Sequence, residues 1–165
     1  QIQLDERPLV RVPPVWQHYE LSATLGRGAF ASVLRATRRA RSHPTIPEHV
    51  AIKMVDKAHG DDLEQLGTEA SAMQALDPHP NVIQLFELFD SCTKLYLVLE
   101  LASGGDLFDR IVARGSLTEA QAAKAMRELC SAIAHVHEQH YCHRDVKPAN
   151  LLCTSDALDA PIKLS

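Results

Sequence analysis

Lys53 occupies a position where a charged side chain needs a partner. It lies within the apolar segment Val50–Val55, which predicts a buried strand, and burial of an unpaired ammonium group is costly. Glu69 follows on a predicted helix, four residues before Met73 of its apolar stripe, so its carboxylate projects from near the buried side. Such a pair could bind phosphate oxygens. Two alternatives stay open: Lys53 could reach water at a strand edge, and Glu69 could be a solvated helix residue.

A turn with two glycines precedes this strand. Gly26-Arg27-Gly28 is flanked by β-favouring residues from Tyr19 to Thr37, which predicts a hairpin with the glycines at its tip. Glycine lacks a Cβ, so the backbone of such a turn can approach phosphate oxygens closely. No Gly-Lys-Ser/Thr follows, which excludes a Walker loop, and the turn does not open a helix as a dinucleotide-binding fingerprint would. Taken alone, the pattern also fits an ordinary hairpin turn.

The segment 143–150 reads His-Arg-Asp-Val-Lys-Pro-Ala-Asn. With this segment the chain resembles the protein kinase family, whose glycine-rich loop, Val-Ala-Ile-Lys strand, helix glutamate and His-Arg-Asp loop appear here in order. His79-Pro80-Asn81-Val82, after the predicted helix, also resembles the family. The resemblance covers residues 19–165. One such motif could arise by chance, whereas four in register could not.

The resemblance implies a role for each residue of these motifs. Asp145 would orient the substrate hydroxyl or accept its proton, Lys147 would neutralise charge on the transferred phosphoryl group, and Asn150 would hold a magnesium ion. Lys53 would bind the α- and β-phosphates of ATP while Glu69 holds it in place. The implied reaction is therefore ATP-dependent phosphorylation, with ATP and Mg²⁺ as the cofactors and a Ser- or Thr-bearing protein as the substrate.

The resemblance also outlines the nucleotide pocket. The backbone at Glu100 and Ala102 would hydrogen-bond the adenine, and Asp106 would contact the ribose or a basic side chain of the substrate. The remaining residues expected around ATP come from the glycine loop, the strands beside it and the segment after the catalytic loop: Leu25, Gly26, Gly28, Val33, Ala51 and Leu152.

Two features refine the resemblance. Lys147, two residues after Asp145, is typical of Ser/Thr kinases, and the stretch Gly104–Ile111 is similar to the calcium/calmodulin-dependent group.

Two residues depart from the family pattern. Ala31 replaces the third glycine of the loop, which predicts a stiffer loop, and Ala149 replaces a glutamate that helps some kinases select an arginine in the substrate.

The elements that carry these residues predict an α+β fold of the bilobal protein-kinase type. Residues 1–18 form an extended lead-in, 19–100 a β-rich lobe with one helix over 61–76, 101–105 a flexible hinge, and 106–165 the start of a helical lobe. Thr118 and Gln121 predict a capping box at the start of a long helix, whose apolar face is expected to be Ala122, Met126, Leu129, Ile133 and Val136. Short strands are expected near 151–153 and 162–164.

Composition excludes several other classes. The 165 residues are 45% hydrophobic with a net charge of −4, which gives no basic footprint for nucleic acid, and no apolar run reaches the roughly 18 residues of a membrane span. The four cysteines form no Cys-x-x-Cys pair, so reduced thiols and a location in the cytoplasm, or the nucleus, are expected. The histidines near residue 140 lack the ligand spacing of a zinc site.

We expect the sequence to be a fragment of a longer chain, because residue 1 is glutamine and Ser165 falls just before the place of the family's Asp-Phe-Gly motif. The parent protein is therefore expected to be an active kinase, with a regulatory protein as a further partner, while these 165 residues alone are expected to be inactive. The alternative is a pseudokinase or truncated product that binds ATP or serves as a scaffold. A nucleotide-binding metabolic enzyme would need a Walker or dinucleotide loop, and neither is present.

Overall fold

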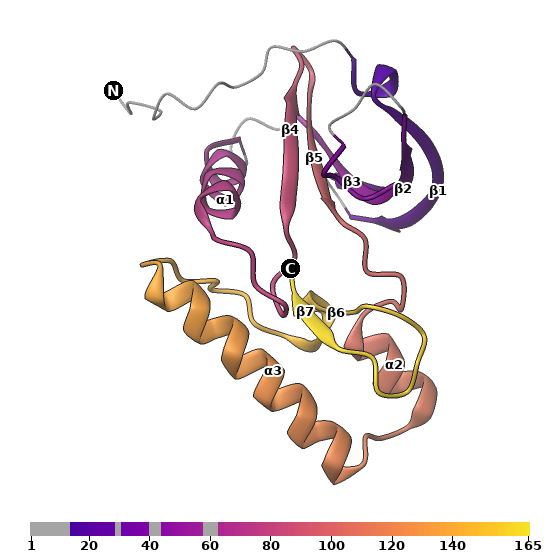
Figure 1. The fold of residues 1–165 in the computed structure, drawn as a ribbon, viewed down its shortest axis with the longest axis vertical. Helices are drawn as coiled ribbons and strands as arrows, with labels where there is room; N and C mark the ends of the chain where they lie inside the picture. Colours follow the sequence, from indigo (N-terminus) through magenta and orange to yellow (C-terminus); the bar gives the residue numbers. More distant parts are fainter. Residues whose placement is uncertain (1–13, 29–30, 40–43, 58–62) are drawn as a thin grey trace. The chain divides into compact units, whose positions relative to one another are not determined.

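The computed structural model describes residues 14–28, 31–39, 44–57 and 63–165 (Figure 1). Most of the predicted lead-in, residues 1–13, lies outside the described residues, as do Ala29 and Phe30 at the predicted loop tip. The chain divides into two compact units, one formed by residues up to Ala70 with Leu85–Leu99, the other by Ser71–Gln84 with Glu100–Ser165. Strands dominate the first and helices the second, which confirms the α+β prediction.

The first unit is built on a five-stranded sheet in the order β1-β2-β3-β5-β4. Neighbouring strands pair antiparallel in β1–β2, β2–β3 and β4–β5. The strands are β1 (Tyr19–Arg27), β2 (Ala31–Arg38), β3 (His49–Asp56), β4 (Leu85–Asp90) and β5 (Lys94–Glu100). A short 3-10 helix, η1 (Val15–Gln17), precedes them. The predicted glycine-tipped hairpin is thus β1–β2, and the lysine strand is β3 at the centre of the sheet.

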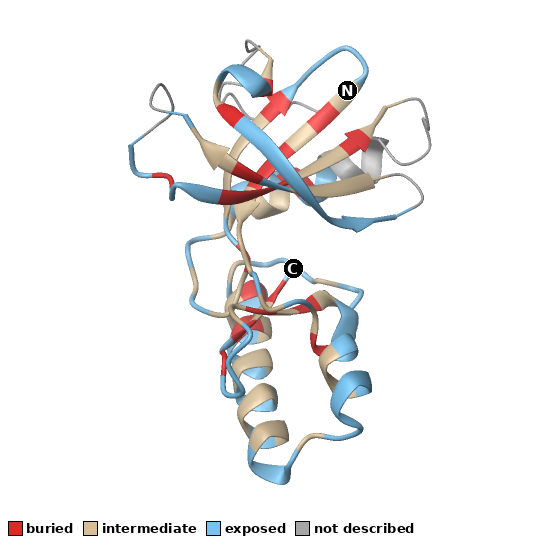
Figure 2. Cartoon of the chain, turned by 90° about the vertical axis from the view of Figure 1, so that its right-hand side faces the viewer, coloured by how far each residue is buried: buried red, intermediate tan, exposed pale blue. Residues whose placement is uncertain are grey.

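Buried apolar residues of this sheet form one core, seen as red segments along the strands in Figure 2. Val50 and Ile52 of β3 and Val98 of β5 are fully buried, as strand alternation and aliphatic side chains favour. Tyr19 is also fully buried, and its hydroxyl donates to Glu87 Oε2 at 2.7 Å. Burial is the main reason that the pKa of Tyr19 lies above its ordinary value. The core therefore packs against the face of β3 opposite to the one that carries Lys53.

Helix α1 (Leu63–Ala75) lies between β3 and β4 in the chain and ends before Asp77-Pro78, as predicted. The β-rich lobe was expected to run unbroken from 19 to 100, whereas residues 71–84 belong to the second unit. The reason is a set of long-range contacts. Val82 forms a parallel bridge with Leu164, Ile83 N–H donates to the carbonyl of Leu164 at 2.8 Å, and Asn81 Nδ2 donates to the carbonyl of Ile162 at 2.8 Å.

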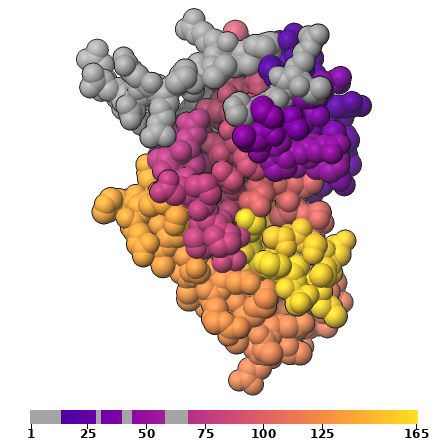
Figure 3. Space-filling model, in the orientation of Figure 1, coloured from indigo at the N-terminus to yellow at the C-terminus, as the bar shows by residue number. Residues whose placement is uncertain are grey.

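The second unit contains two α-helices and a small hairpin. Its elements are α2 (Leu107–Arg114), α3 (Glu119–Glu138), the 3-10 helix η3 (Pro148–Asn150), β6 (Leu151–Cys153) and β7 (Ile162–Leu164). Thr118 caps α3 with the predicted capping box, since its side chain accepts from Gln121 N–H while the Gln121 side chain accepts from Thr118 N–H. β6 and β7 pair antiparallel at the predicted positions. Figure 3 shows this C-terminal part, in yellow, against the orange surface of α3.

A separate apolar core joins α2, α3 and the hairpin. Ala132 and Val136 are the buried residues of α3, and Ala125, Leu129 and Ile133 are partly buried. The predicted apolar face of this helix was wrong at Met126, which is 56% exposed. At 3.6 residues per turn, Met126 lies at the edge of the stripe centred on Leu129 and Ala132 rather than on its middle.

Candidate functional site

The predicted phosphate-binding residues of the first unit share one row across three strands. Gly26 of β1 is opposite Val33 of β2, and Val33 is opposite Lys53 of β3. Directly opposed residues present their side chains on the same face of a sheet, and Ala51, two residues before Lys53, points to that face too. Leu25 is 48% exposed at an irregularity in the pairing of β1. Five predicted ATP contacts thus come from adjacent positions of one sheet.

Lys53 and Glu69 form an ion pair, with Lys53 Nζ donating to Glu69 Oε1 at 2.6 Å. The Lys53 side chain is 27% exposed, and that of Glu69 is 47% exposed. Of the alternatives left open by the sequence, an unpaired Lys53 is excluded in this structure, whereas Glu69 is both the partner of Lys53 and partly exposed to solvent. An ammonium group that is fixed by a carboxylate but still accessible can bind a further anion such as a phosphate oxygen.

The glycines of the β1–β2 turn leave space above the strand. Among the described residues, a Cβ placed on Gly26 would have no atom within 4 Å, and one on Gly28 would approach the carbonyl oxygen of Ala31 at 3.8 Å. Neither residue is among the glycines with positive φ. Packing and backbone conformation in the described residues thus give no reason for glycine at these positions. Close approach of a ligand to the backbone remains as a reason.

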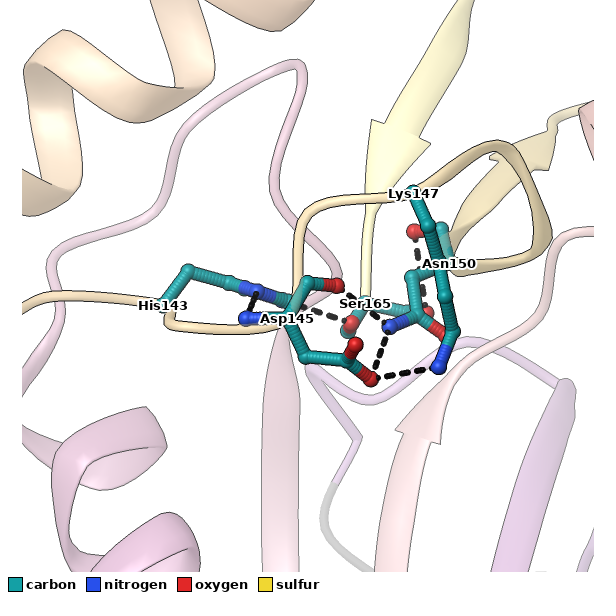
Figure 4. A network of polar contacts seen from close by, with 5 residues as sticks. All are labelled: His143, Asp145, Lys147, Asn150 and Ser165. Atoms are coloured by element: carbon teal, nitrogen blue, oxygen red, sulfur yellow. Dashed lines mark hydrogen bonds and ion pairs between the residues drawn. The ribbon is translucent and has the colours of Figure 1, made fainter.

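In the second unit, the loop between α3 and η3 brings Asp145, Lys147 and Asn150 together (Figure 4). Lys147 Nζ donates to Asp145 Oδ2 at 2.7 Å, and Asn150 Nδ2 donates to the same oxygen at 2.8 Å and to the Asp145 carbonyl at 2.7 Å. Because the amide nitrogen of Asn150 is used in this way, its Oδ1 is left as a possible ligand for a hard cation. Among the described residues, nothing donates to Asp145 Oδ1.

The carboxylate of Asp145 is accessible but electrostatically stabilised. Its side chain is 62% exposed. The hydrogen bond from Lys147, and after it the hydrogen bond from Asn150, hold the pKa of Asp145 below its ordinary value. The group is therefore ionised at neutral pH, with Oδ2 engaged and Oδ1 without a donor among the described residues. This is the state required of a group that orients a hydroxyl or accepts its proton.

His143 connects this loop to the end of β7. Its Nδ1 accepts from the backbone N–H of Asp145 at 3.3 Å, so the ring proton is on Nε2, which lies 2.9 Å from the carbonyl oxygen of Ser165. Ser165 N–H in turn donates to the carbonyl of Asn150 at 3.0 Å. Arg144, which lies between His143 and Asp145 in the sequence, has a positive φ of 63°. A non-glycine residue in that region indicates a backbone held by its surroundings.

The other predicted contacts of the second unit lie around β6. Leu152 is partly buried and forms an antiparallel bridge with Asp106. The carboxylate of Asp106 caps α2 by accepting from Asp109 N–H at 2.8 Å through Oδ1. Glu100 N–H donates to the carbonyl of Gln84, while the backbone N–H of Ala102 has no acceptor in the part of the chain that the structure describes. Ala102 can therefore offer its backbone to a ligand.

Residues 19–165 match the protein kinase domain family. The chain belongs to that family. Its two motif-bearing units are thus the kinase fold that the sequence predicted, and the match spans every predicted site residue.

Named kinases are similar to most of the chain. It is 44% identical over 140 residues to a probable myosin light chain kinase of Dictyostelium discoideum, covering 84% of this chain and 34% of that protein. It is 45% identical over 141 residues to maternal embryonic leucine zipper kinase of Xenopus tropicalis, covering 85% of this chain and 21% of that protein. It is 40% identical over 152 residues to calcium/calmodulin-dependent protein kinase type IV of Rattus norvegicus, covering 92% of this chain and 30% of that protein. The predicted resemblance to the calcium/calmodulin-dependent group is in line with these relatives.

The kinase chain spans about a fifth to a third of the length of these relatives. All four cysteines are unpaired, with Cys153 buried and the other three exposed. Within the described residues, no three His, Cys, Asp or Glu side chains gather in a way that could hold a metal ion. The described helices also include none that is long and apolar enough to cross a membrane.

Sequence reasoning missed two contacts beside the site. Lys163 of β7 pairs with Glu100 at 2.9 Å, and Arg110 of α2 donates to three backbone carbonyls. Arg110 lies within the stretch Gly104–Ile111, but the resemblance assigned it no contact, and Lys163 was assigned none either. The only signals in the sequence were a lysine among the apolar residues of a short strand and an arginine in the first half of a short helix, and both patterns also fit solvent-exposed residues.

Proposed function

We propose that the protein transfers the γ-phosphoryl group of ATP to serine or threonine hydroxyls of protein substrates. The observation that carries this proposal is the Asp145 carboxylate, ionised and accessible, with Lys147 and Asn150 on Oδ2 and Oδ1 open. In the reaction a bond forms between the substrate hydroxyl oxygen and the γ-phosphorus, and the bond to the bridging oxygen of ADP breaks. The hydroxyl proton moves to Oδ1 of Asp145.

The other residues contribute position and charge. Lys53, held by Glu69 at 2.6 Å, would bind the oxygens of the leaving diphosphate. Lys147 lies 2.7 Å from Asp145 and would stabilise negative charge on the transferred group. Magnesium fits the open Oδ1 of Asn150 and would supply neutralisation of phosphate charge there. Space above Gly26 and Gly28 admits the triphosphate close to the backbone.

Serine and threonine are favoured as acceptors by Lys147 two residues after Asp145, and by relatives named myosin light chain kinase and calcium/calmodulin-dependent kinase. We further propose a regulatory protein as partner and a location in the cytoplasm or nucleus. Three exposed cysteines without disulfides support a reducing compartment.

The test is magnesium-dependent transfer of labelled γ-phosphate from ATP to a generic basic protein, using the full-length protein that contains this chain. Asp145→Asn should abolish transfer. Asp159→Asn, which alters an exposed aspartate without a partner among the described residues, should not. Acid hydrolysis of the product should release phosphoserine or phosphothreonine. ATP binding without transfer in the wild type would instead support a pseudokinase scaffold, and phosphotyrosine would contradict the proposed acceptor.

A further inference from the structure

The segment 100–106 of the second unit is joined to the β6–β7 hairpin by backbone hydrogen bonds. Ser103 N–H donates to the carbonyl of Thr154 at 3.3 Å, and Gly104 N–H donates to the carbonyl of Cys153 at 3.0 Å. Cys153 N–H donates back to the carbonyl of Gly105 at 2.8 Å. The predicted hinge 101–105 is therefore not free of its surroundings, as a flexible joint would be, but is hydrogen-bonded to β6.

Arg110 fastens this arrangement from α2. Its Nη1 donates to the carbonyl of Ala157 at 2.8 Å, and its Nη2 donates to the carbonyls of Ser155 at 2.6 Å and Gly104 at 3.3 Å. Ser155 and Ala157 belong to the loop after β6, whereas Gly104 belongs to the segment 100–106. One guanidinium thus connects both backbones. Its planar fork of donors suits three separate acceptors, which the compact ammonium of lysine could not reach together.

Gly104 shows how closely the two backbones approach. A Cβ on Gly104 would lie 2.0 Å from the carbonyl oxygen of Ser155 and 2.9 Å from Arg110 Nη2. At the other end of the segment, Lys163 Nζ pairs with Glu100 Oε2 at 2.9 Å, and Lys163 is directly opposite Leu152 in the hairpin. The segment 100–106 is therefore tethered to the hairpin at both ends.

We infer that Arg110 is a positioning residue for the adenosine end of the nucleotide, an inference that rests on the proposed function. Ala102, Asp106 and Leu152 are the expected contacts of adenine and ribose in this unit, and Arg110 holds together the two backbones that carry them. Arg110 contacts none of the residues assigned to phosphate or to the reacting hydroxyl. Its loss should weaken binding of the nucleoside and leave phosphoryl transfer from bound ATP intact.

The experiment compares Arg110→Met and Arg110→Lys with wild type in the full-length protein. The KM for ATP should rise about tenfold, the size of one lost charge-assisted hydrogen bond, while kcat stays within about threefold. Adenosine, as a competitive inhibitor, should weaken by a similar factor, whereas inhibition by inorganic tripolyphosphate should not change. Arg127→Met, on an exposed arginine of α3 with no partner among the described residues, is the matched control and should leave all four quantities unchanged.

A second readout needs no activity. Without nucleotide, amide hydrogen exchange at Gly104 and Cys153 should accelerate in both Arg110 variants and not in Arg127→Met. An unchanged KM and adenosine affinity in a folded variant would overturn the inference, as would a fall in kcat with KM unchanged. If Arg110→Met does not fold, Arg110→Lys, which keeps charge and chain length, decides. A wild-type protein that binds no ATP would instead refute the proposed function, and the exchange rates would still report whether Arg110 holds the segment.

Discussion

Asp145 owes its ionised state to hydrogen bonds rather than to burial. Lys147 is the largest cause of its lowered pKa, and Asn150 is the second. Because the pKa of Asp145 is lowered, its carboxylate stays charged as the pH falls into the range where an ordinary aspartate takes up a proton. The negative charge is lost only at a lower pH. In Lys147→Met the pKa of Asp145 should therefore rise towards the ordinary value, and in Asn150→Ala it should rise less. Carbon-13 NMR titration of labelled aspartate carboxyls would measure both.

Lys94→Met is a suitable control for that titration, because it removes a lysine that is not among the groups that shift the pKa of Asp145. In wild type, Asp145 should contribute no acidic limb to kcat/KM at or above the ordinary titration range of an aspartate, because its pKa is lowered. A pKa of Asp145 that is unmoved by Lys147→Met would show that the 2.7 Å contact does not stabilise the carboxylate in solution.

Two glycines should respond oppositely to alanine. At Gly104 the new methyl group would meet the backbone of Ser155 at 2.0 Å, so the two backbones must separate. We expect Gly104→Ala to destabilise the protein by about 1–3 kcal/mol, as overpacking commonly does. At Gly26 the methyl group meets no atom of the described residues, so Gly26→Ala should leave stability nearly unchanged but weaken ATP binding if phosphate approaches that backbone.

Urea unfolding and ATP titration of the two glycine variants would check this pair of expectations. Equal stability of Gly104→Ala and wild type would mean that the segment 100–106 can move away from β6 at little cost. Loss of stability in Gly26→Ala, with ATP binding retained, would mean that Gly26 serves the hairpin rather than a ligand.

Among the elements, α3 has the most clearly encoded beginning. Thr118 Oγ1 accepts from Gln121 N–H at 3.2 Å, and Gln121 Oε1 accepts from Thr118 N–H at 3.0 Å. Removal of the cap in Thr118→Ala should cost about 1 kcal/mol of unfolding free energy, because it leaves helix N–H groups without a protein partner. Ser116→Ala, in the preceding turn and outside the capping box, should cost much less.

Chemical denaturation with matched m-values would test the cap. A cost for Thr118→Ala no larger than that for Ser116→Ala would show that water replaces the capping hydrogen bonds without loss. Gln121→Ala, which removes only the reciprocal bond, should fall between the two variants.

The predictable elements are those whose signals are local. The capping pair is three residues apart, the β6–β7 hairpin has apolar strands at both ends, and Asp77-Pro78 terminates α1 whatever surrounds it. The attachment of residues 71–84 to the second unit was not predictable, because it depends on the Asn81–Ile162 contact between residues 81 positions apart. The same applies to Arg110, whose acceptor Ser155 is 45 residues away.

In the candidate site, too, contacts within a short stretch of sequence were predictable, whereas contacts between distant residues were not. Asp145, Lys147 and Asn150 lie within six consecutive residues, so their motif nearly determines their proximity. The pairing of Lys53 with Glu69 needs α1 to pack on the lysine face of the sheet, and the sequence left that open. Met126 was wrongly predicted to belong to the packed face of α3, because the spacing of apolar residues does not show where the packed surface ends.

At the scale of the whole molecule, the described residues contain two separate buried clusters, one in each unit. Ile52 is fully buried in the first and Ile162 is 3% exposed in the second. Truncation of either to alanine creates a cavity and should cost about 2–5 kcal/mol locally. Since proteins open in cooperative units, Ile52→Ala should accelerate amide exchange mainly in β1–β3, and Ile162→Ala mainly in β6, β7 and α3.

Site-resolved hydrogen exchange by mass spectrometry would separate these outcomes, with Ile52→Val and Ile162→Val as milder versions that remove one methyl group, at a cost of about 0.5–1.5 kcal/mol. Confinement of the faster exchange to the mutated unit would mean that each cluster stabilises its own half of the predicted nucleotide contacts. Lys53 with Glu69 and Asp145 with Asn150 could then be disturbed separately. Equal acceleration in both units by either variant would contradict this, because it would show that the two clusters unfold as one cooperative core.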